Sequence, residues 1–114
     1  MPAFTIKKDD LEPALNATLV AVDGGAALDL TTASGVTFRM WKQRATGGAY
    51  KVNRAASIVS AIAGTVRVNW QAGDTDEVGD FLGEFVVTWA GGRPQTIPTA
   101  GALHVRVEDG GLPG

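Results

Sequence analysis

The stretch from 64 to 89, GTVRVNWQAGDTDEVGDFLGEFVVTW, alternates apolar and polar residues on both sides of a corner rich in glycine and aspartate. Before the corner, Val66, Val68 and Trp70 alternate with polar residues. After it, four apolar residues share one parity: Phe81, Phe85, Val87 and Trp89. Because successive side chains of a β-strand point to opposite faces, this period of two predicts two half-buried strands joined by a tight turn.

Short strands of the same kind are predicted along the rest of the chain, at 4–7, 15–21, 35–42, 95–98 and 103–108, with a brief crossing segment at 28–31. The segment 51–63 fits either a short helix or a strand. We favour a strand at 56–60, because every flanking unit reads as a strand, although local propensity alone favours a helix. The shared parities predict a core that contains Phe38, Trp70, Phe81, Phe85, Val87 and Trp89.

About seven such strands predict an all-β fold, a two-sheet antiparallel immunoglobulin-like sandwich. The acidic corner followed by Phe81 resembles the turn that enters the F strand of such sandwiches. With 114 residues, the chain fits a single domain, which we place at 1–109 and follow with a flexible tail at 110–114.

Composition argues against several classes of function. The chain has no cysteine, which removes disulfides, thiolate nucleophiles and cysteine-based zinc sites. Its net charge is −2 and its ten basic residues are scattered, whereas nucleic-acid binding needs clustered Lys and Arg. No window approaches the roughly 18 apolar residues of a membrane span, and no secretion signal is evident. We therefore expect no nucleic-acid or membrane partner, no cofactor and no small-molecule substrate.

The residues that could carry catalysis or hold a metal do not form a familiar site. The sole histidine, His104, falls in the last predicted strand beside Val105, and we expect it to be exposed. Asp74-x-Asp76 begins like a calcium loop, but Val78 and Phe85 stand where oxygen ligands are required. We expect a corner without metal, in which Asp74 or Asp76 accepts hydrogen bonds from its own turn, and a protein that is not an enzyme.

Binding by surface is the remaining hypothesis. Trp41 has the parity opposite to Phe38, so it faces outward, and Trp, Tyr and Arg are enriched where interfaces carry binding energy. The alternative is that the chain's own 45–55 loop covers Trp41. The apolar segment 58–63 would invite a partner strand if its edge is exposed. The candidate partner-binding residues are Arg39, Trp41, Lys42, Arg44, Tyr50, Ile58 and Ile62.

An ordered set of segments resembles the N-terminal immunoglobulin-like domain of the bacteriophage baseplate upper protein family. The set comprises FTIKKDD at 4–10, LNATL at 15–19, VTFRM at 36–40, the run from 64 to 79, EFVVT at 84–88, Gly92 and Pro98. It departs from the usual pattern of such sandwiches at Phe81, where tyrosine is usual at the corner.

This resemblance implies a non-enzymatic structural protein of a phage particle, found in the virion and, during assembly, in the host cytoplasm. It would dock in multiple copies on other virion proteins of the capsid, tail or baseplate. The brevity of the chain favours a decoration protein of the head exterior or a tail or baseplate component. The alternative is a carbohydrate- or host-surface-binding module.

Overall fold

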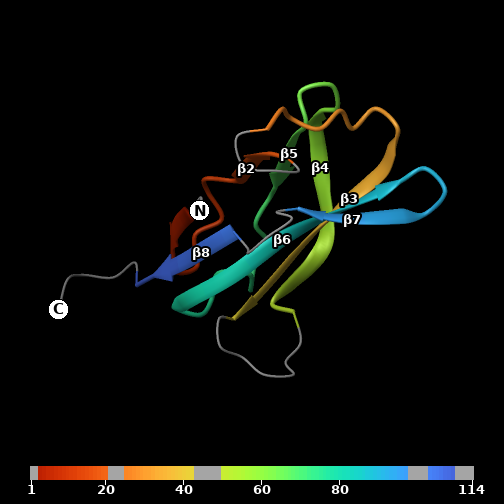
Figure 1. The fold of residues 1–114 in the computed structure, drawn as a ribbon. Helices are drawn as coiled ribbons and strands as arrows, with labels where there is room; N and C mark the ends of the chain where they lie inside the picture. The colour runs from red at the N-terminus through yellow and green to blue at the C-terminus, as the bar shows by residue number, and fades with distance from the viewer. Residues whose placement is uncertain (1–2, 21–24, 43–49, 98–102, 110–114) are drawn as a thin grey trace.

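The computed structural model describes residues 3–20, 25–42, 50–97 and 103–109, and this part of the chain is all-β (Figure 1). None of these residues belongs to a helix that is long and apolar enough to cross a bilayer. The strands are β1 (Ala3–Lys7), β2 (Leu15–Thr18), β3 (Ala33–Lys42), β4 (Val52–Ser60), β5 (Thr65–Val68), β6 (Gly79–Trp89), β7 (Arg93–Ile97) and β8 (Leu103–Glu108). The all-β class expected from the alternation is confirmed.

The strands follow one path in the order β1-β8-β6-β3-β4-β5-β2, which is nearly closed into a barrel. All pairs along it are antiparallel except β1 with β8, which is parallel. Two further strands pair with β6, one after the other along its length. β8 pairs with residues 79–83 of β6, and β7 pairs with residues 85–89. The long strands β3 and β6 therefore form the centre of the fold (Figure 1).

The core lies on the inner face of this curved sheet. β3 alternates buried and half-buried residues from Val36 to Trp41, and Phe38, directly across from Phe85, has no exposed surface. The Phe38 ring centroid lies 5.1 Å from that of Phe85 and 6.0 Å from that of Trp70. The predicted core residues Phe38, Trp70, Phe81, Phe85 and Val87 are all buried. Trp89 is only half-buried, and its indole N–H donates to Gln95 Oε1 at 2.9 Å.

The structure decides between helix and strand at 52–60, and it differs from the prediction at 15–21 and 28–31. Segment 52–60 is a strand rather than a helix, because both neighbouring strands pair with it. The strand predicted at 15–21 ends at Thr18, after which Val20 forms a single bridge with Ala27. Residues 28–30 form no strand. Instead, the Leu30 N–H donates to the Ala61 carbonyl at 2.7 Å and fixes this segment on the turn after β4.

Candidate functional site

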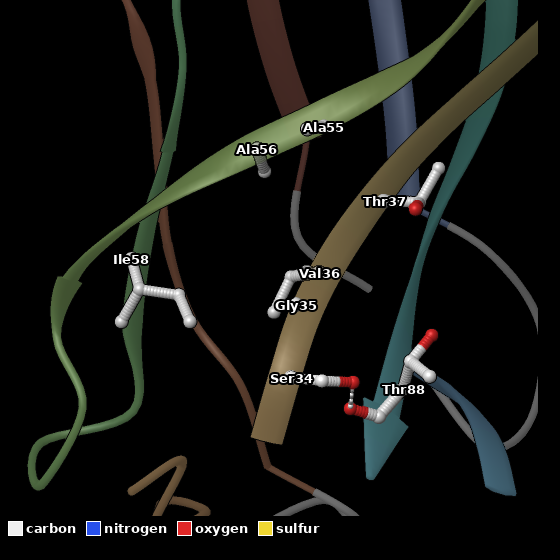
Figure 2. Close-up of a pocket in the computed structure, with 8 residues that line it drawn as sticks. All are labelled: Ser34, Gly35, Val36, Thr37, Ala55, Ala56, Ile58 and Thr88. Carbon is white, nitrogen blue, oxygen red and sulfur yellow. Dashed lines mark hydrogen bonds between the residues drawn. The ribbon is translucent and has the colours of Figure 1, made fainter. Parts of the chain in front are cut away.

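β4 changes partner halfway along its length. Its first half, from Val52 to Ala56, pairs with residues 40 to 36 of β3. From Ser57 onward it pairs with β5 instead. The first part of β3, residues 33–35, keeps only β6 beside it among the described strands. The edge of β3 that faced β4 is therefore open, and the two strands separate like the arms of a fork (Figure 2).

A bulge stands on each arm of this fork. On β3, Ala33 pairs with Trp89 and Gly35 with Thr88, so Ser34 is an extra residue. On β4, Ile58 pairs with Val66 and Ser60 with Thr65, so Val59 is an extra residue. A bulge bends its strand and increases its local twist, and both bulges lie beyond the last β3–β4 pair, Val36 with Ala56.

A groove occupies the space between the two arms and has a volume of about 510 Å³. We call it the fork groove, and its lining residues are Ser34, Gly35, Val36, Thr37, Ala55, Ala56, Ile58 and Thr88. Figure 2 shows the side chains of Val36, Ala56 and Ile58 pointing into the space between β3 and β4. The lining of the groove is therefore of mixed polarity, because Ser34, Thr37 and Thr88 line it together with the aliphatic side chains.

The polar groups of the fork groove are uncharged, and the Ser34 hydroxyl already donates a hydrogen bond within the protein. Its Oγ donates to the Thr88 carbonyl at 3.0 Å. A Cβ built on Gly35 would meet no heavy atom within 4 Å, which shows that the space over this face of β3 is open. None of the eight lining residues titrates near neutral pH. Such a lining can hold an uncharged group, but it offers no acid, base or metal ligand.

An exposed apolar surface adjoins the fork groove. Among the described residues, six large apolar side chains are exposed, and three of them lie within five residues of one another on β4 and the turn after it. We call these three, Ile58, Val59 and Ile62, the β4 patch; they are 37%, 54% and 77% exposed. Scattered apolar residues are normal on a protein surface, whereas a large contiguous apolar patch is typical of a contact site.

A second cluster lies where β3 and β4 approach the 43–49 connection. The Trp41 and Tyr50 rings pack edge to face with centroids 6.1 Å apart, and the Arg39 guanidinium carbon lies 5.4 Å from the Tyr50 ring centroid. Arg39 Nε is buried without a hydrogen-bond partner. Trp41 is half-buried on the outer side of β3, as its parity predicts, and Tyr50 covers one side of it.

The acidic corner before β6 is occupied by ion pairs with the neighbouring hairpin. Lys42 binds Glu77, Lys51 Nζ lies 2.5 Å from Asp76 Oδ1, and Arg54 contacts both oxygens of Asp74. The lysine hydrogen bonds lower the pKa of the Asp76 and Glu77 carboxyls below their ordinary values. Among the described residues, no group of three or more His, Cys, Asp or Glu side chains is arranged to hold a metal ion.

The predicted partner-binding residues fall into separate surfaces. Arg39, Trp41 and Tyr50 do come together, whereas Lys42 is held by Glu77. Arg44 lies outside the described residues. Ile58 is six residues beyond Val52 on β4, roughly 20 Å away at about 3.3 Å per residue. His104 is exposed on β8 beside the buried Val105, as expected.

The sequence reasoning missed most of the fork groove. Its lining consists mainly of small uncharged residues, which carry no chemical signature in a sequence. One signal was available, because a glycine inside a strand pattern, here Gly35, often marks a bulge or an open approach to the backbone.

Comparison with known proteins supports the fold alone. No family model matches the chain, and no curated protein matches it. Among solved structures, the fold is similar to that of CopC from Methylosinus trichosporium OB3b, with a TM-score of 0.57 and 10% sequence identity. The match covers 100% of this chain and 91% of CopC. At this identity the likeness concerns the arrangement of strands.

The function expected from the sequence, a structural protein of a bacteriophage particle, is wrong. The structural match is CopC, not a phage structural protein, and no family or curated protein connects the chain to a virion. The resemblance to the baseplate upper protein family rests on strand and turn residues and stays a prediction. Alternation and turn chemistry report how a chain folds, and a fold hosts many functions.

Proposed function

We propose that this protein is a non-enzymatic binding domain that docks another protein on the β4 patch. One observation carries the proposal: half of the exposed large apolar side chains in the described part of the chain gather on one hairpin tip. Burying Ile58, Val59 and Ile62 against a partner would remove apolar area from water at about 25 cal/mol per Å².

The charge distribution supports the same surface. The sequence from Ala55 to Val66 contains no charged residue, although 19% of the chain is Asp, Glu, Lys or Arg. A charged residue at the centre of an interface must be desolvated, and interface centres are depleted of charge for this reason. The β4 patch therefore has the composition of an interface centre, with Arg54 and Arg67 at its borders.

The absence of titrating groups from the fork groove supports a binding role over a catalytic one. General acid–base chemistry needs a side chain with a suitable pKa within hydrogen-bond reach of the reacting atom. The groove supplies hydroxyl groups from serine and threonine and no base to activate them. His104, which could act as a base, lies exposed on β8.

The finer architecture that fits this role is a two-sheet immunoglobulin-like sandwich. In it, β8, β6, β3 and the first half of β4 form one layer, and the second half of β4 with β5 and β2 forms the other. The change of partner along β4 supports this division. The β4 patch would then lie just beyond the point at which β4 passes from one layer to the other.

Site-specific photocrosslinking tests the docking surface. A benzoylphenylalanine at position 62 is compared with one at position 11, because Leu11 is also apolar and exposed but lies outside the β4 patch. After irradiation in cells of the source organism, we expect a discrete protein adduct at position 62 and none at position 11. Adducts that are the same at both positions, or absent from both, would reject the proposal.

Affinity measurements with the purified adduct protein complete the test. Ile62→Asp should weaken its binding at least tenfold, because the aspartate would have to be desolvated in the interface. Val78→Asp is the matched control, since Val78 is 46% exposed and lies beside the acidic corner. Equal weakening by both substitutions would assign the effect to net charge and overturn the proposed surface.

A further inference from the structure

We infer that the docked protein places a carboxylate on Arg39, so that one interface extends from the β4 patch along β4 to Arg39, Trp41 and Tyr50. We call these three residues the Arg39 cluster. The inference rests on the proposed function and specifies the chemistry of the partner. That partner is a protein with an aspartate or a glutamate beside its apolar contact surface.

Arg39 is a half-buried cation that has no carboxylate partner among the described residues. Three other cations of the same hairpin, Lys42, Lys51 and Arg54, each bind a carboxylate of the acidic corner. Glu84 is the register partner of Arg39 on β6, yet these two side chains form no ion pair. Because a partly desolvated cation gains most from an ionised acceptor, a carboxylate is the group that best complements Arg39.

The Arg39 guanidinium is already positioned by an aromatic ring. Its carbon lies 5.4 Å from the Tyr50 ring centroid, and Trp41 packs edge to face against the same ring. Arg39 Nε is buried without a hydrogen-bond partner. A planar guanidinium that is held in advance loses little conformational entropy on binding, which favours two parallel hydrogen bonds to one carboxylate.

An exposed ribbon along β4 joins the Arg39 cluster to the β4 patch. Asn53 is the register partner of Arg39 on β4, and the alternate residues that follow, Ala55, Ser57 and Val59, are also exposed. From Asn53 to Val59 the strand spans about 20 Å, at about 3.3 Å per residue. An ordinary interface covers about 800 Å² of each partner, which is about 30 Å across. One docked protein can therefore contact both surfaces.

Photocrosslinking at a second position tests whether one partner contacts both surfaces. A benzoylphenylalanine at position 53, the exposed neighbour of Arg39 on β4, is compared with one at position 62 in the same cells. We expect the same protein in both adducts. An adduct at position 62, with none or a different protein at position 53, would overturn the inference and leave the proposed function in place. An adduct at position 53 alone, or at neither position, would reject the proposed function and the inference with it.

Substitution of Arg39 tests its part in the binding. Arg39→Gln and Arg39→Lys should each weaken binding of the purified adduct protein at least fivefold, because lysine keeps the charge but lacks the planar fork of donors. Arg93→Gln, at an exposed position on β7, is the matched control and should change the affinity less than twofold. Arg39→Lys keeps the test decisive if Arg39→Gln does not fold. Equal affinities of the folded Arg39 and Arg93 variants would overturn the inference.

A double-mutant cycle identifies the carboxylate. Each aspartate and glutamate in the crosslinked segment of the adduct protein is changed in turn to its amide. One such change should weaken binding to the wild type at least fivefold and binding to Arg39→Gln less than twofold, because that variant has already lost the contact. If no acidic residue of the partner shows this coupling, the inference is wrong.

Discussion

Arg54 and Asp74 form a two-point contact between β4 and the acidic corner. Arg54 Nη1 donates to Asp74 Oδ1 at 3.2 Å and Nη2 donates to Oδ2 at 2.5 Å. The side chain of Asp74 is only 9% exposed, and its Oδ2 also accepts from the Gln71 N–H at 2.8 Å. The same guanidinium donates to the Asn69 carbonyl at 2.9 Å. A single arginine thus links β4, the end of β5 and the corner.

Removing this arginine should destabilise the fold. Arg54→Ala leaves the buried Asp74 carboxylate without its cation, and we expect a loss of about 1.5–3 kcal/mol, the range for hydrogen bonds to charged groups. Urea unfolding followed by tryptophan fluorescence measures it. Arg67→Ala, which removes only an exposed contact with Asn16, is the control. An equal loss in both variants would show that the buried Arg54–Asp74 pair contributes no more to the free energy of unfolding than the exposed Arg67 contact does.

The packing of Phe85 against Phe38 gives a second prediction. Phe85→Ala should cost about 3–5 kcal/mol, because a large side chain leaves a well-packed core. The 5.1 Å ring contact would be lost in the same step. Leu11→Ala, at an exposed position, should change the free energy of unfolding by less than about 0.5 kcal/mol. A loss below about 1 kcal/mol for Phe85→Ala would mean that the site collapses around the missing ring.

Gly64 in the turn after β4 cannot accept a side chain. Its φ is +71°, and a Cβ built there would lie 2.4 Å from the Leu28 carbonyl oxygen. Gly64→Ala should therefore lower the melting temperature more than Gly73→Ala, because Gly73 also has a positive φ, of +93°, but faces open space. If the two variants have the same melting temperature, segment 28–30 does not pack against Gly64 as closely as the structure shows.

The ion pairs of Lys51 with Asp76 and of Lys42 with Glu77 should make the free energy of unfolding depend on pH in the acid range. The pKa values of Asp76 and Glu77 are lowered by hydrogen bonds from Lys51 and Lys42, from ordinary values of 3.8 and 4.5. A carboxyl with a lowered pKa in the folded state stabilises the protein above its unfolded pKa, and this contribution is lost as pH falls through the folded pKa. Stability should therefore decrease from about pH 5 downward.

Removing the two lysines should make this decrease shallower. The double variant Lys42→Ala, Lys51→Ala is compared with the wild type by melting temperature from about pH 6 to pH 3 at low salt, where exposed pairs are least screened. Arg93→Ala, on β7, serves as the control for a lost positive charge. Parallel pH profiles for the wild type and the double variant would contradict the expectation.

Calcium should leave the melting temperature unchanged. Asp74, Asp76 and Glu77 each already bind a cationic side chain, so a metal ion would have to displace those contacts. A ligand that binds only the folded state must raise the melting temperature. Differential scanning calorimetry with millimolar calcium, and again after addition of chelator, makes the comparison. A rise that the chelator reverses would establish a calcium site at the corner.

The core could be predicted from the sequence because its signal is local. The parity of Phe38, Phe85 and Val87 is set within each strand, and the structure buries all three. The strand at 52–60 was harder, because its side chains also fit a helix. The neighbouring strands favour a strand there, but the prediction at 56–60 covers only its second half, and pairing with β3 and β5 supplies the physical reason for its full length.

The fork groove could not be predicted because it arises from non-local pairing. Whether β4 stays beside β3 beyond Ala56 depends on how well β5 competes for it, and no short window contains that information. The bulges at Ser34 and Val59 are visible only once two strands are set side by side. Function was harder still, since the strand and turn residues that suggested a phage protein describe a common type of chain.

The parallel pairing of β1 with β8, in which Phe4 lies opposite Val105, has a consequence for biosynthesis. While the nascent chain is being made, the first strand has to wait for the last one to leave the ribosome before it gains its neighbour. Until then Ile6 and the first half of β6, which β8 also borders, cannot complete their burial. We therefore expect the domain to complete its fold only once β8 has left the ribosome, and to depend on the cell's protection of its unpaired strands in that interval.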